Sequence, residues 1–530
     1  MPLPANGTPW PPKALDRITP TLAEHAAWWA GDTAGLEKTY QAPWRNRPSQ
    51  YAGGVVGAVS RMWWGRPVLD GGAQAGRKLH VPIAAELARA SATLLYAEAP
   101  SFTVEHEATQ ARLAELVDDG LLRVLAEGAE EGAALGGHYL RVTWDSEIEP
   151  TRPFVTSVSA DAAWPEFRHG RLLAVTFWHV VRIDGQQMWR HLERHELDAN
   201  RNGIILHGLY RGTTSDLGIH VPLTDDPSTA SLAAHVVEDA ISTASPGLAV
   251  VYIPNQRPSS WRNEPLGQHL GRSDLAGVEG LMDALDEAYS SWMRDIRLGK
   301  ARLLVNSSAL DDLGPGQGAA FDTDREIFTP LNAPPSSAVN ASTIAQAEQP
   351  EIRFEAHRST CLALIERILA AAGYSPATFG LDDAHGAAQT ATEVKARQQL
   401  SFRTRDGKLR IIRPALSDLL HKLLHVDAAI FGTPISPERP QVEFPDGVQE
   451  SMLSLAQTAQ ALRAAEAAST RTLVRVLHPE WDDDQIDTEV TAIMDEQAAA
   501  VPALPDPTDP TLIDGATGPV DNPTDVPTGA

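Results

Sequence analysis

In the second half of the chain, apolar residues recur at steps of three and four along three long segments. This spacing places them on one side of a helix and predicts three amphipathic α-helices. The first is expected to open at Ser273, whose hydroxyl can cap the first turn, and to run to about Lys300. The second is expected from about Glu351 to Ala372, followed by Gly373, a residue that tolerates the left-handed conformation just past a helix.

The third helix is expected to begin at Thr390, which has capping-box spacing to Glu393, and to continue towards Ala429. Pro414 lies inside this pattern. Because proline removes a backbone donor and clashes with the preceding turn, we expect a kink there.

The two segments that connect these helices differ in composition. Residues 301–349 contain the short apolar runs 303–305 and 327–328, which predict strands around a glycine-rich turn at 314–318. The second connection, Phe379–Gln389, is short and consists largely of small residues. Such a segment can bend freely, since glycine and alanine add little bulk.

The first half of the chain predicts helices followed by an antiparallel β region. Helices are expected at 80–97 and 109–135, separated by an extended piece at 102–104. Alternating patterns then predict strands at 139–144, 154–158, 173–181, 187–197 and 204–210. Asp184-Gly185 and Asn202-Gly203 have the composition of hairpin turns. Helices that precede a meander predict an α+β fold.

The two ends of the chain have different compositions. Residues 1–50 are rich in proline and tryptophan and predict an arm with one short helix near 22–29, packed on this subunit or on a neighbour. Residues 443–497 have helical patterns. Residues 498–530 contain seven prolines, five aspartates and no lysine or arginine, which predicts a disordered acidic tail.

Composition excludes several classes of protein. The chain has 530 residues and a net charge of −25, so it is not as a whole a basic nucleic-acid binder. Its one cysteine, Cys361, lies on an apolar helical stripe, which predicts a buried thiol and a reducing compartment. The first residues lack the pattern of a signal peptide, and no apolar run is long enough to cross a membrane.

Candidate catalytic motifs are weak. No Gly-x-x-x-x-Gly-Lys-Ser/Thr loop for a nucleotide occurs. His191 and His195 lie in an extended stretch, where this spacing separates them by about 13 Å, so we expect surface or paired histidines and no zinc site. The carboxylate pairs Asp283/Asp286 and Asp482/Asp483 could in principle hold magnesium, but an outward polar face and a helix N-cap are the favoured explanations.

The third helix is unusually basic for such an acidic chain. Three interpretations are open: ion pairs with the acidic first helix of a neighbouring subunit, phosphate contacts in a channel, or a solvated face. The residues are Lys395, Arg397, Arg403, Arg405, Lys408, Arg410 and Arg413, against Asp406 alone.

Three short phrases carry a resemblance to a known family. They are the acidic helix 281–286 (Leu-Met-Asp-Ala-Leu-Asp), the helix end 371–376 (Ala-Ala-Gly-Tyr-Ser-Pro) and the helix start 390–394 (Thr-Ala-Thr-Glu-Val). With the β-containing segment between the first two helices, they make the chain resemble the portal proteins of tailed double-stranded-DNA bacteriophages, especially long-tailed phages of Gram-positive hosts. The resemblance covers roughly residues 51–497 and includes no catalytic signature.

The resemblance implies a division into the regions of a portal fold. These are an N-terminal arm (1–50), a wing (51–272), a stem helix (273–300), a clip (301–349), a second stem helix (350–374), a tunnel loop (375–389), a long kinked helix that returns to the wing (390–442), a helical crown (443–497) and the acidic tail (498–530). The tunnel-loop residues would be Phe379, Gly380, Asp382, Asp383, His385, Gly386 and Gln389.

The resemblance also implies a function. Such a protein forms a ring of about twelve subunits at one capsid vertex, through which DNA is packaged and ejected. Its partners would be its own copies, double-stranded DNA, the large subunit of the terminase, and capsid and head-tail adaptor proteins; no membrane is expected. It would be assembled in the host cytoplasm and reside in the virion, without catalytic residues, metal or cofactor. Two alternatives are a metal-dependent nuclease and a head-morphogenesis or scaffold protein that forms no ring.

Overall fold

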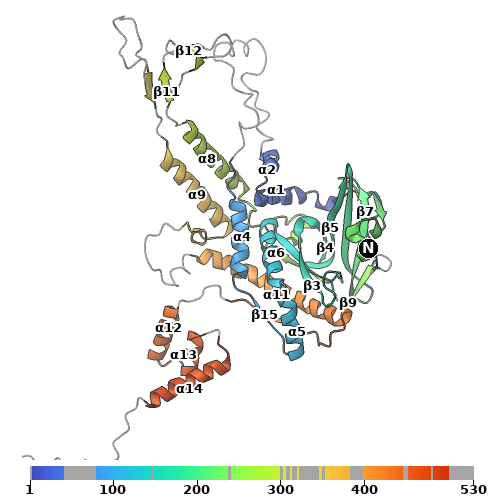
Figure 1. The fold of residues 1–530 in the computed structure, drawn as a ribbon, viewed down its shortest axis with the longest axis vertical. Coiled ribbons are helices and arrows are strands. Elements are labelled where there is room, and N and C mark those ends of the chain that lie inside the picture. The colour runs from blue at the N-terminus through green and yellow to red at the C-terminus, as the bar shows by residue number, and fades with distance from the viewer. Residues whose placement is uncertain are drawn as a thin grey trace, which may run out of the picture. The chain divides into compact units, whose positions relative to one another are not determined.

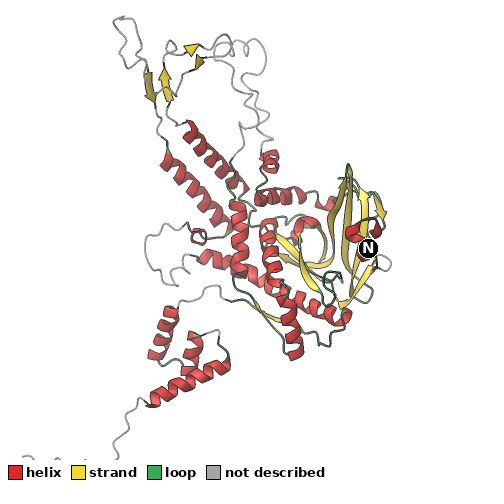
Figure 2. Cartoon of the chain, viewed as in Figure 1, coloured by secondary structure: helices red, strands yellow, loops and turns green. Residues whose placement is uncertain are grey.

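The computed structural model describes residues 3–40, 79–145, 147–234, 236, 240–298, 302–305, 311–312, 319–320, 345–348, 352–381, 398–445, 452–478 and 481–499. The chain divides into two compact units. The first comprises residues 1–387 and 394–447, and the second comprises 388–393 and 448–530. Helices and antiparallel sheets both contribute, so the predicted α+β class is confirmed (Figure 2).

Two long helices of the first unit lie side by side (Figure 1): α8 (Glu279–Leu298) and α9 (Phe354–Ala372). They run antiparallel, because Asp295 near the end of α8 accepts hydrogen bonds from Arg353 and His357 at the start of α9, at 2.7 and 2.8 Å. Their shared apolar core includes Leu285, Cys361, Ile365 and Ile368. Cys361 is a buried free thiol, as predicted.

The end of α9 agrees with the sequence, but the start of α8 does not. Gly373 caps α9 in the left-handed conformation, with φ 92°. The prediction that the first helix opens at Ser273 is wrong, since α8 begins at Glu279. The Ser273 hydroxyl does accept from the amide of Leu275, at 3.0 Å, but it caps only a turn. Gly277 then takes φ 93° and separates that turn from the helix.

The long helix α11 spans Gln399–Ile430 without interruption at Pro414. Its predicted start at Thr390 lies outside the described residues. One face of the helix is buried in the largest apolar core of the unit. That face includes Leu409, Ile412, Leu416, Leu419, Leu420, Leu423 and Leu424.

After its N-terminal segment, the first unit continues with α4 (Ile83–Tyr96), β1 (Ser101–Thr103), α5 (Glu107–Asp118) and α6 (Leu121–Leu135). The prediction of one helix over 109–135 is wrong, because Gly120 takes φ 85° and divides it into two. Alternating apolar spacing continues across this break, so periodicity alone did not show it.

The antiparallel β region is confirmed. One sheet has the strand order β4-β5-β6-β7-β8, and β9 also pairs with β7. A second, three-stranded sheet has the order β10-β2-β3. The bounds are β2 Gly137–Thr143, β3 Phe154–Ser159, β4 Ala163–Arg168, β5 Arg171–Asp184, β6 Gln187–Leu197, β7 Asn202–Gly212, β8 Ile219–Val221, β9 Ala240–Pro246 and β10 Val250–Pro254. β1 pairs with β15 (Gln441–Glu443).

One of the two predicted hairpin turns is displaced. Gly185 lies in the β5–β6 turn with φ 60°, as expected from Asp184-Gly185. Asn202-Gly203, in contrast, is the start of β7, and Gly203 pairs with Leu197. The preceding turn instead contains Arg201 at φ 67°, and Asp198 Oδ1 accepts from the amides of Asn200 and Asn202.

The N-terminal segment packs on its own chain, which is one of the two predicted alternatives; the other was packing on a neighbouring subunit. It contains η1 (Lys13–Leu15), α1 (Thr19–Ala30) and α2 (Thr33–Tyr40); the first and last were not predicted. Trp10 is buried against the edges of Trp164 and Trp178, at 6.3 and 5.1 Å between ring centroids. This tryptophan therefore anchors the arm on the larger sheet.

In the segment 301–349, β11 (Arg302–Val305) pairs with β14 (Ala345–Glu348), and β12 (Asp311–Asp312) pairs with β13 (Ala319–Ala320). The expected strand at 303–305 is confirmed; the one at 327–328 lies outside the described residues. In the second unit, α12 (Met452–Ala464), α13 (Thr470–Leu477) and α14 (Asp483–Ala499) confirm the helical prediction. The predicted acidic tail lies outside the described residues from 500 onward.

Candidate functional site

The segment 382–397, which contains most of the predicted tunnel loop, starts and ends at one place in the first unit. After α9 ends at Gly373, the short helix η9 (Pro376–Phe379) leads to Gly380, with φ 70°. α11 begins shortly after the segment. We call the described residues just before and just after this segment its base.

Hydroxyl groups join the two sides of this base directly. The Thr404 hydroxyl donates to the Gly373 carbonyl oxygen at 2.6 Å, and the Ser375 amide donates to the Ser401 hydroxyl at 2.8 Å. The hydroxyls of Thr378 and Ser401 lie 2.7 Å apart. Ser375 and Ser401 are buried, so these hydrogen bonds are protected from water and fix the separation of the two ends.

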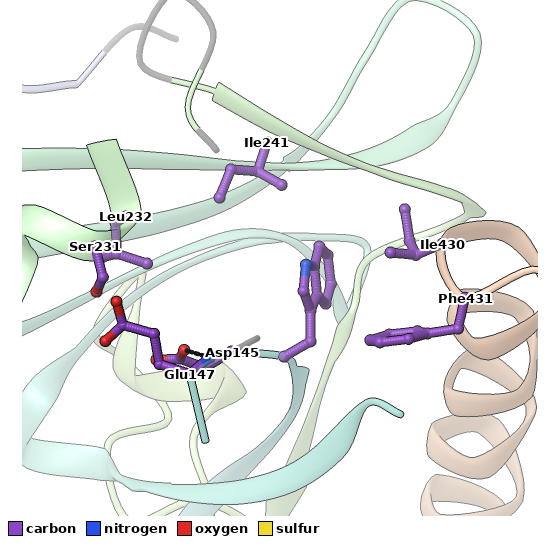
Figure 3. Close-up of a pocket in the computed structure, with 8 residues that line it drawn as sticks. Asp145, Glu147, Ser231, Leu232, Ile241, Ile430 and Phe431 are labelled. Carbon is purple, nitrogen blue, oxygen red and sulfur yellow. Dashed lines mark hydrogen bonds between the residues drawn. The ribbon is translucent and has the colours of Figure 1, made fainter. Parts of the chain in front are cut away.

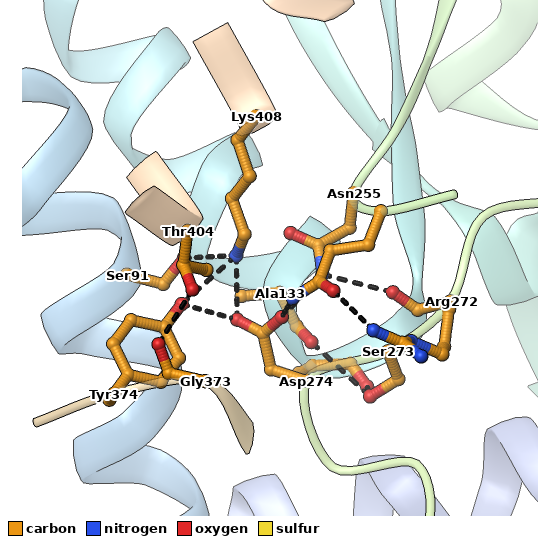
Figure 4. A network of polar contacts seen from close by, with 12 residues as sticks. Ser91, Ala133, Asn255, Arg272, Ser273, Asp274, Gly373, Tyr374, Thr404 and Lys408 are labelled. Carbon is orange, nitrogen blue, oxygen red and sulfur yellow. Dashed lines mark hydrogen bonds and ion pairs between the residues drawn. The ribbon is translucent and has the colours of Figure 1, made fainter. Parts of the chain in front are cut away.

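One turn further along α11, Lys408 enters a buried polar network (Figure 4). Its ammonium donates to Asp274 Oδ2 at 2.6 Å, to the Ser91 hydroxyl at 2.6 Å and to the Tyr374 hydroxyl at 3.1 Å. The Tyr374 hydroxyl also donates to Asp274 Oδ2, at 2.7 Å. Lys408 and Asp274 are each only 3% exposed. The network thus ties α11 to α4 and to the end of α9.

Asp274 is the centre of the network. Its Oδ1 accepts from Asn255 Nδ2 at 2.8 Å and from Gln256 Nε2 at 2.6 Å, both just after β10. Its backbone amide donates to the Ala133 carbonyl of α6, at 2.9 Å. Because every carboxylate lone pair has a partner, the buried charge is well compensated.

The charge of Lys408 depends on this aspartate. Burial lowers the pKa of the Lys408 ammonium, and the Asp274 carboxylate opposes that shift. Burial also raises the pKa of the Tyr374 hydroxyl far above its usual range, so it remains a donor. We call Ser91, Asp274, Tyr374 and Lys408, together with Ser375, Ser401 and Thr404, the loop-base network.

The basic residues predicted on this helix differ in their exposure to solvent. Lys408 and Arg405 are buried and have partners inside the chain: the Arg405 guanidinium donates to the carbonyls of Leu94, at 2.7 Å, and Pro445. Arg403 and Arg410 are exposed. Contact with DNA or a neighbouring subunit stays a prediction for all four residues.

Of the other predicted site residues, the structure describes only some. Phe379 and Gly380 lie at the base. The remaining ones lie outside the described residues: Asp382, Asp383, His385, Gly386, Gln389, Lys395 and Arg397.

Sequence reasoning missed the residues that complete the network. Asp274 follows Ser273, the predicted helix cap, and Tyr374 follows Gly373, the predicted helix end, so neither position indicated a buried polar contact. The only available signal was a lone lysine at a position where the α11 apolar stripe continues, with Leu409 and Ile412 beside it. A lysine there needs an internal partner, but sequence alone does not identify which carboxylate supplies it.

A family model described as phage portal protein, SPP1 Gp6-like, matches residues 70–503. The chain belongs to this family of portal proteins. A solved structure titled "Neck of native GTA particle computed with C12 symmetry" contains a chain 14% identical to this one, with a TM-score of 0.37 over 75% of this chain and 89% of that chain. No curated protein sequence matches the chain. The family match alone carries the assignment.

Membership makes the chain a structural component of a phage particle and favours that role over an enzymatic one. In the described part of this portal protein, no helix has both the length and the apolar character needed to cross a membrane. Among the same residues, no three side chains of the metal-binding types gather to hold an ion.

The carboxylates considered for a nuclease have other partners in this portal protein. Asp286 is buried, not on an outward polar face, and it accepts from the Val81 amide at 2.8 Å and contacts His80 at 3.0 Å. Asp482 accepts from the Gln485 amide at 2.8 Å, which confirms a capping role before α14. Asp483 forms ion pairs with Arg471 and Arg475.

The histidines of β6 are paired, as expected, but they are not on the surface. His191 Nε2 lies 3.1 Å from His207 Nδ1, and the two rings are stacked. His195 Nε2 contacts Glu193 Oε1 at 2.7 Å, and Glu193 also pairs with Arg141. Although burial opposes its charge, Arg141 and His195 hold the pKa of Glu193 well below its usual range.

A shallow pocket lies away from the loop base (Figure 3). Its lining is apolar at Trp144, Leu232, Ile241 and Ile430, with Asp145 and Glu147 at one side. The carboxylate of Asp145 is engaged by the amide of Glu147, at 2.9 Å. The pocket therefore offers no convergent set of catalytic groups.

Proposed function

We propose that copies of this chain close into a ring of about twelve subunits at one capsid vertex, and that DNA passes through its centre during packaging and ejection. Family membership supports the assembly. The loop-base network supports the role of residues 382–397, because its hydrogen bonds join the chain before this segment, at Gly373 and Ser375, to the start of α11 after it, at Ser401 and Thr404.

The composition of this segment favours a steric valve over a tight grip. Asp382, Asp383 and His385 are its only ionisable members before Gln389, and the rest are small or apolar. Each neutralised phosphate adds affinity through counterion release, and moving DNA would have to break every such contact repeatedly. A net charge of −25 likewise disfavours adhesion of a polyanion.

We further propose that residues 301–349 are the surface that docks the terminase large subunit during filling and head-tail adaptor proteins afterwards. The pairing of β11 with β14 supports this role, since Arg302 follows α8 closely and Glu348 precedes α9 closely. The strand pair thus extends the α8–α9 hairpin, and we propose that the partner binds there. The ATP chemistry of packaging would belong to the terminase.

The valve is tested by replacing residues 382–389 with a glycine-serine linker of equal length and assembling particles with that variant. We expect rings and filled particles to form, but nuclease-protected DNA to fall because DNA leaks back. A control variant carries the same linker at residues 503–510 of the C-terminal tail. Equal amounts of protected DNA in both variants would contradict the valve without contradicting the ring.

A further inference from the structure

His421 and His425 lie one turn apart on α11, outside the loop-base network. Their Nε2 atoms are 3.2 Å apart, and the rings meet nearly edge to face, with centroids separated by 4.5 Å at 73°. Both side chains are only partly buried, so ions in solution can reach them. Neither the family assignment nor the proposed channel gives these two residues a role.

This separation is the one that a metal ion imposes on two imidazole ligands. Zinc–nitrogen bonds are about 2.0–2.1 Å long, so two nitrogens in a tetrahedral shell lie about 3.3 Å apart. Two histidines at i and i+4 on one helix face are also the arrangement that helical zinc sites use. In the metal-free chain the same distance suits a hydrogen bond between the rings, so an ion can replace the shared proton with little movement.

The helix holds the pair in place. Leu419, Leu420, Leu423 and Leu424 are buried on its other side and keep this part of α11 ordered. The nearby charged side chains pair with one another: Asp418 accepts from Arg439 at 3.0 Å and lies 3.4 Å from the Lys422 ammonium. The lysine between the two histidines therefore has a carboxylate partner of its own.

We propose that His421 and His425 chelate one borderline divalent transition-metal ion, such as Ni²⁺, Cu²⁺ or Zn²⁺, through their Nε2 atoms. Imidazole ligands suit these ions and not Mg²⁺ or Ca²⁺. No third ligand joins the pair among the described residues, so water completes the coordination shell. The site is open, in contrast to the closed four-ligand shell of a structural zinc.

Chelation from an accessible position distinguishes this pair, because the two facing imidazoles of His191 and His207 are buried. The sequence contains 17 histidines, and an isolated one binds an ion through a single nitrogen. Once one ring of the pair has bound, the second is already within bonding distance, so its effective concentration is high. The pair should therefore fill first when Ni²⁺ is limiting.

The test is isothermal titration of the full-length, untagged protein with Ni²⁺ in a buffer that does not bind metal. We expect one ion per chain at the highest-affinity site. His421→Gln and His425→Gln should each weaken that site by about tenfold or more, because only one nitrogen remains. His220→Gln, at an exposed histidine of β8, should leave it unchanged.

The unfolding temperature of each variant, measured with and without Ni²⁺, distinguishes loss of the metal site from failure to fold. Ni²⁺ should raise the unfolding temperature of the wild type and of His220→Gln, and should not raise that of His421→Gln, since an ion that binds only the folded helix stabilises it. Retention of the strongest site in both pair variants, or an equal Ni²⁺ effect on the unfolding temperature of all four proteins, would overturn the proposal.

Discussion

The Lys408–Asp274 ion pair is the contact on which the loop base depends most. Removing one member of a buried pair leaves the other charge without compensation, which costs about 3–5 kcal/mol. We therefore expect Lys408→Met to lower the free energy of unfolding by about 3 kcal/mol in urea denaturation. Arg410→Met, two residues away and exposed, is the matched control and should change it by less than about 0.5 kcal/mol. Similar losses in both variants would contradict the role of the network.

Buried histidines give the protein a specific sensitivity to acid. Burial lowers the pKa of His138 and of His191 to about 3, and that of His207 to about 4. Below the unfolded pKa of about 6.5 the unfolded chain binds protons that the folded chain refuses, so stability falls as the pH drops. Each such histidine contributes a slope of about 1.4 kcal/mol per pH unit until its folded pKa is reached.

His138 is the most suitable of these histidines for a test, because neither ring nitrogen has a hydrogen-bond partner. We expect His138→Phe to reduce the slope of stability against pH by about 1.4 kcal/mol per unit between pH 6 and 4. Urea denaturation at several pH values measures this slope. His220→Gln serves as the control, and an unchanged slope in His138→Phe would show that this ring is not the group excluded from protonation.

The same ring explains why α6 has a glycine at position 132, which the open position of Gly407 does not need. A Cβ added at Gly132 of α6 would lie 2.6 Å from His138 Nδ1, whereas one at Gly407 of α11 would meet nothing within 4 Å. Alanine favours a helix over glycine by about 1 kcal/mol. We expect Gly407→Ala to raise the unfolding temperature and Gly132→Ala to lower it, in scanning calorimetry. A rise in both would mean that the His138 ring moves aside without cost.

At the scale of whole elements, the sequence predicted what local spacing determines. Gly373 marks the end of α9 because only a residue without a Cβ takes that conformation easily, and looser alternation located β6 and most of β5. The predicted helix boundaries were wrong where an apolar pattern continues across a break in the helix. Gly120 and Gly277 both take positive φ inside a continuing stripe, so one predicted helix became two and another started late.

The candidate site could be predicted only in part, for a different reason. Phe379 and Gly380 follow directly from the predicted end of the second helix, so chain order places them before the segment 382–397. Asp274 and Lys408, in contrast, are far apart in the sequence and meet only because α6, α9 and α11 pack around the same point. Tertiary packing therefore decides which charged residues of a basic helix face solvent and which become internal.

The two ends of the segment 382–397 should open locally when their hydroxyl contacts are lost. Thr404→Val keeps the shape of the side chain but leaves the Gly373 carbonyl without its donor. We expect a loss of about 1 kcal/mol in stability and faster hydrogen exchange at residues 374–380, with little change in α4. Thr360→Val, at an exposed position of α9, is the control. Uniformly faster hydrogen exchange throughout the first unit would contradict the prediction that the opening is local.

At the scale of the whole molecule, the charge of the chain is the relevant property. Arg405 and Lys408 have partners inside the chain, so we expect them to add little to the attraction for DNA. The family assignment and the acidic composition then support one account, in which identical chains surround a channel whose lining binds DNA weakly.

Electron microscopy of the purified, full-length protein tests this account most directly. Class averages should show closed rings with a central opening that admits a DNA duplex, and the rotational symmetry of those averages gives the number of subunits. A protein that remains monomeric or dimeric at every concentration, or rings whose opening is too narrow for a duplex even when residues 382–397 are deleted, would contradict it.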